Sequence, residues 1–113
     1  MLKEFGQMAG LLRNMGKIRE EAERFQAKLG EIVAEGAAGG DMVVAKANGR
    51  MEVLSVKISE AAWALQDREM LEDLIAAATN QALAKVREQV NQEAQSMAAN
   101  LGLPPGAGLP GLP

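Results

Sequence analysis

The chain has 113 residues, of which 48% are hydrophobic and 24% charged, and its formal net charge is −3. This composition is typical of one small globular domain, and the net acidity argues against a generic binder of polyanions. The sequence contains neither cysteine nor histidine, which excludes disulfides, thiolate nucleophiles, the commonest general base and the commonest transition-metal ligand. We therefore expect a non-enzymatic protein with no cofactor, no metal site and no small-molecule substrate.

Charge and hydropathy are unevenly distributed along the chain. Residues 1–19 carry four basic side chains against one acidic side chain, whereas residues 60–73 carry five acidic side chains against one basic. No stretch approaches the roughly 18 consecutive apolar residues of a membrane-spanning helix. Polar residues also interrupt any apolar run of a signal peptide near the amino terminus. The expected location is the cytoplasm, with no membrane partner.

Residues 5–33 are predicted to form a long amphipathic helix, because apolar residues recur at the alternating spacings of three and four that make a heptad repeat. At about 1.5 Å per residue, four heptads make a helix of roughly 40 Å, which is longer than a domain of this size covers. The apolar seam of this helix is therefore expected to pack against the second helix or another subunit. Its candidate core and dimer residues are Met8, Leu11, Met15, Ile18, Phe25 and Leu29.

The segment 36–40, Gly-Ala-Ala-Gly-Gly, is predicted to be a flexible turn after this helix. A phosphate-binding loop is the alternative interpretation, but such a loop leads directly into the amino terminus of a helix. Here β-prone residues follow instead, so the sequence favours a turn.

Two β-prone runs, 42–47 and 50–58, flank an Asn-Gly dipeptide. Asn-Gly in this position predicts a β-hairpin with a two-residue turn, because both residues tolerate positive φ. This turn would place Ala47 opposite Arg50. An isolated two-stranded hairpin is only marginally stable, so we expect helices to cover it or the sheet to continue across a dimer.

A second long helix is predicted from about Arg68 to Asn100, with Asp67 as its capping residue. The acidic residues of its first turns suit the positive end of the helix dipole; a site for a hard cation is the alternative interpretation. Before it, Ser59 is expected to cap a short turn that ends at Trp63, whose indole we interpret as a packing anchor rather than a base-stacking platform. The predicted apolar face of the long helix consists of Leu71, Leu74, Ile75, Ala78, Ala82, Val86, Val90 and Met97.

The polar face of the first helix is the most informative functional feature. At about 100° per residue, four basic residues lie within a strip about 60° wide opposite the apolar seam; they are Arg13, Lys17, Arg24 and Lys28. Arg13 and Lys17 form a like-charge i,i+4 pair, whose repulsion an anionic partner would relieve. Glutamates share the strip, so a purely solvated face is the alternative interpretation. A nucleic acid is a partner of this kind, and its candidate contact residues come from both long helices: Lys3, Arg13, Lys17, Arg19, Arg24, Lys85 and Arg87.

All four prolines lie in the last twelve residues, which excludes a helix or a central strand there. We therefore expect one domain over residues 1–101 and a flexible tail rich in Gly, Pro and Leu over residues 102–113. Three leucines of the tail leave open a docking role: Leu103, Leu109 and Leu112.

The most specific motif of the chain is Asp-Arg-Glu-Met-Leu-Glu-Asp-Leu at residues 67–74, and the Asn-Gly hairpin and the Leu-Pro-Gly tail support it. In these motifs and in the order of its elements, nearly the whole chain resembles the YbaB/EbfC family of bacterial nucleoid-associated proteins. The resemblance implies an α+β fold, in which a long N-terminal helix, an antiparallel hairpin or small sheet and a long C-terminal helix form a tweezer-like intertwined homodimer. It also implies binding of double-stranded DNA, a change in DNA conformation, and a role in nucleoid organisation or gene regulation.

The family has no compact site motif to transfer, so the DNA-contact residues above depend on the charge pattern alone. A protein–protein adaptor that docks through its helical seam or its C-terminal tail is the alternative function. A gel-shift measurement with duplex DNA would distinguish the two functions, because only DNA binding predicts a shift that depends on salt.

Overall fold

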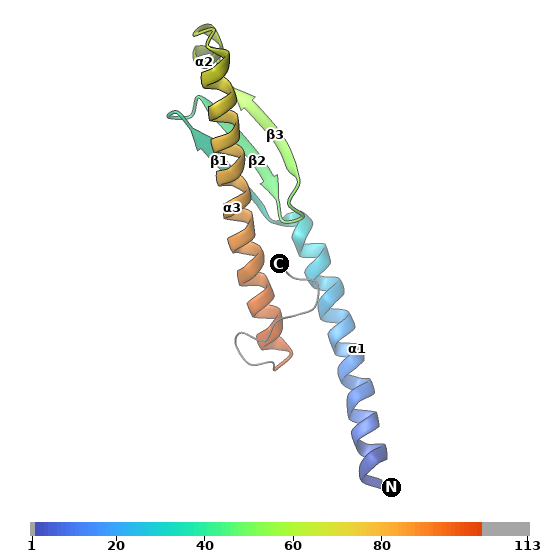
Figure 1. The fold of residues 1–113 in the computed structure, drawn as a ribbon. Coiled ribbons are helices and arrows are strands. Elements are labelled where there is room, and N and C mark those ends of the chain that lie inside the picture. Colours follow the sequence, from blue (N-terminus) through green and yellow to red (C-terminus); the bar gives the residue numbers. More distant parts are fainter. Residues whose placement is uncertain (1, 103–113) are drawn as a thin grey trace. The chain divides into compact units, whose positions relative to one another are not determined.

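The chain folds into helices at both ends and a small sheet between them in sequence, as the computed structural model shows (Figure 1). In chain order the elements are α1 (Leu2–Glu31), β1 (Val33–Ala38), β2 (Val43–Asn48), β3 (Val53–Ile58), α2 (Glu60–Ala64) and α3 (Arg68–Asn100). The three strands form one antiparallel sheet in the order β1-β2-β3. The predicted α+β class, with a long helix at each end, is confirmed.

The structure describes residues 2–102, so residues 103–113 of the predicted tail lie outside the described residues. The chain divides into two compact units. One unit contains α1 up to Ala27 together with α3 from Glu93, and the other contains residues Lys28–Gln92. Within the described range, no helix has an apolar stretch long enough to cross a lipid bilayer.

The end of α1 differs from the prediction, because the chain turns into a strand that the sequence did not reveal. α1 ends at Glu31, and β1 follows with the sequence Val-Ala-Glu-Gly-Ala-Ala. Alanine and glycine are depleted in strands, so the extended conformation of β1 comes from its pairing with β2, in which Gly36 lies opposite Ala45. The predicted turn over 36–40 is therefore only partly correct, since the turn occupies residues 39–42.

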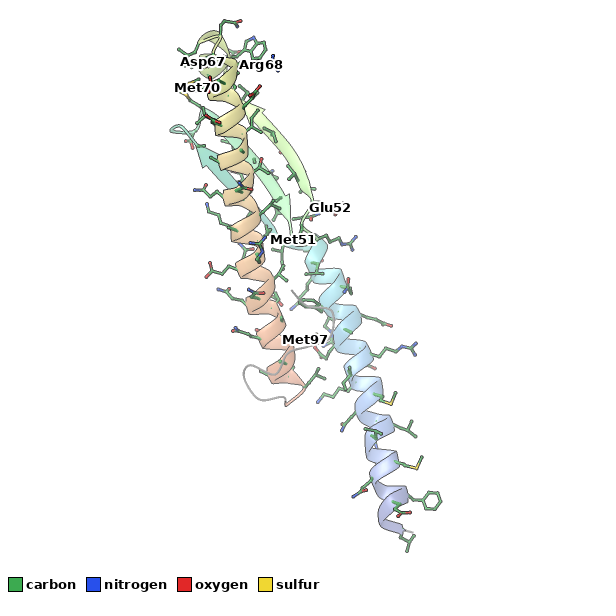
Figure 2. All side chains as sticks on the ribbon, viewed as in Figure 1. Met51, Glu52, Asp67, Arg68, Met70 and Met97 are labelled. Carbon is green, nitrogen blue, oxygen red and sulfur yellow. The ribbon has the colours of Figure 1, made fainter. Side chains whose placement is uncertain are left out.

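The predicted hairpin is formed by β2 and β3, but its predicted two-residue turn is wrong. Ala47 pairs with Val53 rather than with Arg50, and the register of the two strands shifts between Lys46 and Ala47. The side-chain oxygen of Asn48 accepts two hydrogen bonds from backbone N–H groups inside the loop, at 3.0 and 3.2 Å. A longer loop of this kind is stable because asparagine bonds to its own turn. Met51 has a positive φ of 63°, and Figure 2 labels this residue at the loop that connects β2 to β3.

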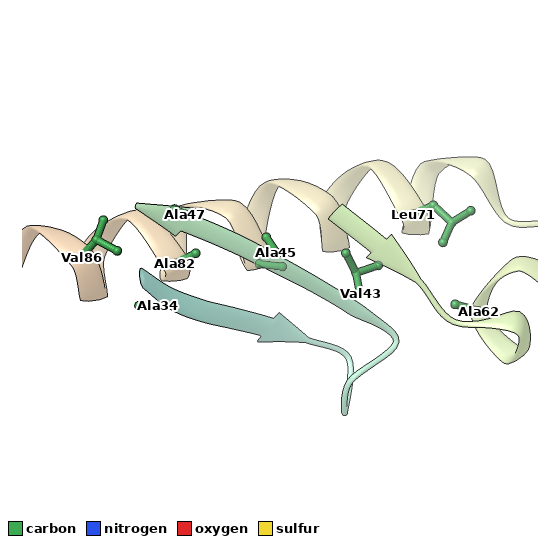
Figure 3. Close-up of a cluster of buried hydrophobic side chains, with 9 residues drawn as sticks. Ala34, Val43, Ala45, Ala47, Ala62, Leu71, Ala82 and Val86 are labelled. Carbon is green, nitrogen blue, oxygen red and sulfur yellow. The ribbon is translucent and has the colours of Figure 1, made fainter. Parts of the chain in front are cut away.

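The core lies between one face of the sheet and α3 (Figure 3). Its buried residues are mostly small: Ala34, Val43, Ala45, Ala47, Ala62, Leu71, Ala78, Ala82 and Val86. These small side chains let the backbone of α3 approach the strands closely. The approach is close at Gly36, where an added Cβ would lie 2.2 Å from the Ala78 carbonyl oxygen and 2.4 Å from the Ala82 nitrogen. No side chain fits there, so this glycine is required by helix–sheet packing.

α2 and α3 begin at the predicted capping residues. Ser59 Oγ accepts a hydrogen bond from the Ala62 N–H at 3.1 Å. Asp67 Oδ1 accepts one from the Met70 N–H at 3.1 Å, and Figure 2 labels Asp67 and Met70. The predicted apolar face of α3 is confirmed at its centre, where the buried residues follow the predicted spacing. The interpretation of Trp63 as a packing anchor is wrong for the described chain, because 62% of its surface is exposed.

Candidate nucleic-acid interface

The basic strip that the sequence predicts lies on the exposed surface of α1. Arg13 and Lys17 are both exposed, and neither side chain makes a hydrogen bond or an ion pair within the part of the chain that the structure describes. They lie one helical turn apart, about 40° from each other around the axis. Their repulsion costs a few tenths of a kcal/mol, which an anionic ligand would relieve.

Arg24 continues this strip, but its guanidinium already has a partner. Its Nη1 donates to Glu21 Oε1 at 2.5 Å, and 59% of the arginine side chain remains exposed. Only 12% of the Glu21 side chain is exposed, so this ion pair is only partly open to solvent. A phosphate can reach the exposed part of this guanidinium, and the rest of it is bonded to Glu21.

Arg19 does not belong to the strip. It follows Lys17 by two residues, which places it about 160° away around the helix axis. At this angle it lies on the same side of α1 as Met8 and Met15. The positive charge that the sequence gathers at the amino terminus is thus divided between two faces of the helix.

The two candidates on α3 differ in their contacts. Lys85 Nζ donates to the Glu35 carbonyl oxygen of β1 at 3.0 Å, so this ammonium has a structural contact that the sequence did not indicate. Arg87 is exposed, and its side chain has no partner within residues 2–102. DNA contact by either residue stays a prediction. The side chain of Lys3 lies outside the described residues.

Three basic residues of the sheet unit were not among the predicted contacts. Arg50 lies beside the last turn of α1, with its guanidinium 3.7 Å from the position of a Cβ on Gly30, where the helix dipole favours a cation. Lys46 Nζ lies 3.8 Å from Glu35 Oε1, and Lys57 is exposed. The hairpin sequence contains these residues, but only the fold shows that they share one unit.

The acidic start of α3 is explained by local helix chemistry. Asp67 caps the helix, and the Arg68 Nε donates to Glu72 Oε1 at 2.9 Å (Figure 2 labels Asp67 and Arg68). Within residues 2–102, no group of three acidic side chains is arranged to hold a metal ion. The positive end of the helix dipole favours these carboxylates at the start of α3.

The amino-terminal half of the predicted apolar seam is exposed. The exposed fractions are 62% for Met8, 61% for Leu11, 56% for Met15 and 48% for Ile18. Further along α1, Phe25 is buried and Leu29 is half-buried. In the described chain, the seam is therefore left without apolar cover over its first two heptads.

These features define a small α+β protein in which one long helix carries a basic strip on one face and an uncovered apolar seam on the opposite face. The chain belongs to the YbaB/EbfC DNA-binding family, whose model matches residues 5–101. The resemblance that the sequence motifs indicated is confirmed.

Individual relatives extend over nearly the whole chain. A nucleoid-associated protein of Moorella thermoacetica is 41% identical over 99 residues, which cover 88% of this chain and 95% of that protein. A nucleoid-associated protein of Bordetella avium is 40% identical over 105 residues, which cover 93% of this chain and 96% of that protein. Among solved structures, an uncharacterized protein from Helicobacter pylori has a TM-score of 0.65 at 26% identity, over 82% of this chain and 95% of that chain. The similarity thus includes the helices as well as the sheet.

Proposed function

We propose that the protein binds double-stranded DNA as a homodimer, through contacts between phosphates and the basic strip of α1, and that it is part of the bacterial nucleoid in the cytoplasm. Membership of a DNA-binding family supports DNA as the partner, and the names of the relatives support the nucleoid. The main support for this DNA-contact surface is that Arg13 and Lys17 are both exposed and have no partner in the described chain. Phosphate contacts position a protein on DNA without reading bases, so we expect little sequence preference.

The exposed seam supports the homodimer. Monomeric proteins rarely leave large contiguous apolar surfaces in water. From Met8 to Ile18 the seam runs for about 15 Å along α1 at 1.5 Å per residue. Pairing with the same seam of a second copy would remove these side chains from water and leave the basic strip, on the opposite face, free to meet DNA.

The open edge of the sheet also supports a dimer. In the described chain α3 covers the β1 edge with side chains and leaves the β3 edge uncovered. At the β1 edge, Gln81 Oε1 accepts a hydrogen bond from the Ala37 N–H at 2.7 Å, and Lys85 bonds to the carbonyl oxygen of Glu35. At the β3 edge, no described side chain covers the strand, and its apolar residues are 38–50% exposed: Val53, Leu54, Val56 and Ile58. Open apolar edges favour pairing with another strand, so we place a second copy at β3.

A dimer offers one basic strip from each copy, and two separated strips can bend or compact the DNA that they both contact. Such an activity would serve nucleoid organisation or gene regulation. Within this proposal, residues 1–101 form the DNA-binding and dimerisation domain and residues 102–113 form the tail.

The experiment that tests phosphate binding is a titration of random-sequence duplex DNA with the full chain at several salt concentrations. With two or three cations from each copy, we expect roughly four to six phosphate contacts, and the logarithm of affinity should fall with the logarithm of salt by about 0.9 per contact. Binding that does not respond to salt would contradict the proposed contacts. An absence of binding at low salt would favour the adaptor function instead.

A further inference from the structure

The hairpin loop, residues 48–52, is bonded to the end of α1. The N–H of Gly49 donates to two carbonyl oxygens there, that of Leu29 at 3.0 Å and that of Ile32 at 2.9 Å. The last four carbonyl groups of an α-helix have no partner within the helix, and the loop supplies one from a distant part of the sequence. These residues all belong to the compact unit Lys28–Gln92. The last turn of α1 is therefore attached to the hairpin of its own sheet.

Gly49 is required by this contact and not by its backbone conformation. It is not among the described glycines with positive φ, so its backbone lies outside the left-handed region that favours glycine. A Cβ at this position would lie 2.5 Å from the Leu29 carbonyl oxygen and 3.2 Å from Ile32 Cβ. Any side chain here would have to push the loop and the end of α1 apart.

The rest of the hairpin loop holds Gly49 in place. Asn48 is buried, its Oδ1 accepts hydrogen bonds from the N–H groups of Arg50 and Glu52, and its Nδ2 donates to Glu52 Oε1 at 3.0 Å. Met51, which Figure 2 labels with Glu52, has the left-handed φ that is uncommon for a residue with a side chain. Such a conformation persists only where surrounding contacts fix it. The loop thus presents the Gly49 N–H in one defined position.

Arg50 adds an electrostatic contact to the same helix end. Its Nε and Nη2 lie 3.7 Å from the position of a Cβ on Gly30, and the negative end of the helix dipole favours a cation there. α1 is one continuous helix from Leu2 to Glu31. Because secondary elements act as stiff bodies, a contact that fixes the last turn also restricts the earlier turns that carry the basic strip.

We propose that the hairpin loop is a clamp that fixes the orientation of α1, and that Gly49 and Arg50 are positioning residues for DNA binding. This role rests on the proposed function, since it concerns the placement of the basic strip. The proposed seam joins α1 to a second copy, whereas the clamp joins it to its own sheet. A strip that is already held in one orientation loses less freedom when it meets phosphates, and preorganisation of this kind raises affinity.

Gly49→Ala tests the clamp, and Gly30→Ala is the matched control. A Cβ on Gly30 would make only an ordinary contact, 3.7 Å from Arg50 Nε, so this alanine leaves the clamp closed. Residual dipolar couplings of the backbone amides, measured without DNA, report whether α1 and the sheet share one orientation. We expect one alignment tensor to fit both elements in the parent and in Gly30→Ala. In Gly49→Ala, the couplings of α1 should decrease while those of the sheet are retained.

A Gly49→Ala protein whose α1 and sheet still share one tensor would overturn the clamp. If this variant does not fold, Arg50→Gln decides the question, because Arg50 is exposed and its removal leaves the core intact. We expect the couplings of α1 to decrease in Arg50→Gln as well, by less than in Gly49→Ala. Unchanged couplings in a folded Arg50→Gln would then overturn the clamp.

DNA binding tests the positioning role. The affinity of folded Gly49→Ala for random-sequence duplex should fall about tenfold, because α1 then has to be ordered on binding. The slope of the salt dependence should stay that of the parent, since every cation is retained. Parental affinity in a variant with a loosened α1 would overturn the positioning role. A parent that does not bind DNA would overturn the proposed function and this role with it, whereas the couplings decide the clamp independently of DNA.

Discussion

The ammonium of Lys85 on α3 donates a hydrogen bond to the carbonyl oxygen of Glu35 on β1, at 3.0 Å. These residues are fifty positions apart in the sequence, and their contact satisfies a backbone group at the edge of the sheet. Gln81, one turn earlier on α3, satisfies the N–H of Ala37 on the same edge. The helix thus closes one edge of the sheet with side chains and leaves the β3 edge open.

We expect Lys85→Ala to lower the free energy of unfolding by about 1 kcal/mol, because the exposed carbonyl of Glu35 would then have no protein donor. Arg87→Ala is the matched control, since Arg87 is two residues further along and has no partner among the described residues. Urea denaturation of both variants gives the comparison. Equal stabilities would show that the contact contributes nothing to the fold.

Gly36→Ala should be strongly destabilising, by about 3 kcal/mol or more, because the new Cβ would overlap the backbone of α3. The opposite result is expected at Gly10, which lies in α1 with open space around its Cα. There, alanine should stabilise the helix by about 1 kcal/mol. Thermal denaturation of the two variants measures both effects, and a tolerated Gly36→Ala would contradict the close approach of β1 and α3.

Changing Arg13 and Lys17 together to Glu should weaken DNA binding sharply, because the proposed surface changes from positive to negative. The slope of the salt dependence should also decrease by about one for each phosphate that the variant no longer binds. Stability should move by no more than about 0.5 kcal/mol, as for other exposed residues. The measurements are fluorescence anisotropy with labelled duplex and thermal denaturation.

The control for this experiment is Lys46→Glu with Arg68→Glu, which makes the same change of charge on the sheet unit, away from the seam and from the β3 edge. We expect it to weaken binding less than the α1 pair does. An equal decrease of affinity in both double variants would show that net charge, rather than the strip on α1, governs binding. If the α1 pair binds as the parent does, the strip is a solvated face and Arg87 becomes the next candidate.

Leu11→Asp or Ile18→Asp should dissociate the dimer, since either would place an unpaired carboxylate in an apolar interface. Sedimentation velocity at micromolar concentration should give twice the chain mass for the parent and the monomer mass for these variants. Ala27→Asp introduces the same charge on an exposed position opposite the seam and should leave the dimer intact. A monomeric parent would remove the proposed assembly.

The open β3 edge can be tested separately with Ile58→Lys, because lysine on an edge strand opposes pairing with a further strand. Trp63 is the only tryptophan of the chain and follows β3 closely, so its fluorescence reports on this region. We expect its emission to shift to longer wavelength in the Ile58→Lys variant, as the indole becomes exposed to water. An emission that already matches free tryptophan in the parent dimer would argue that β3 is not at the interface.

The long helices and their caps were predictable from the sequence, because their causes are local. Ser59 and Asp67 bond to N–H groups three residues away, and the apolar spacing of α3 repeats within every turn. The same locality made Arg13 and Lys17 recognisable as neighbours, since a helix brings residues four positions apart onto one face. These features follow from backbone geometry that any helix imposes on its own sequence.

The tertiary structure decided the features that depend on distant partners. β1 is a strand, despite its alanines and glycine, because β2 provides its hydrogen bonds and α3 lies close above Gly36. Arg50 was not a candidate contact because its place beside the last turn of α1 is set by the hairpin loop. Lys85 looked like a free cation because no local pattern reveals a carbonyl fifty residues earlier. Hydrogen bonds and steric contacts between distant segments form only when the whole unit folds. They therefore cannot be predicted from the residues that adjoin each partner in the sequence.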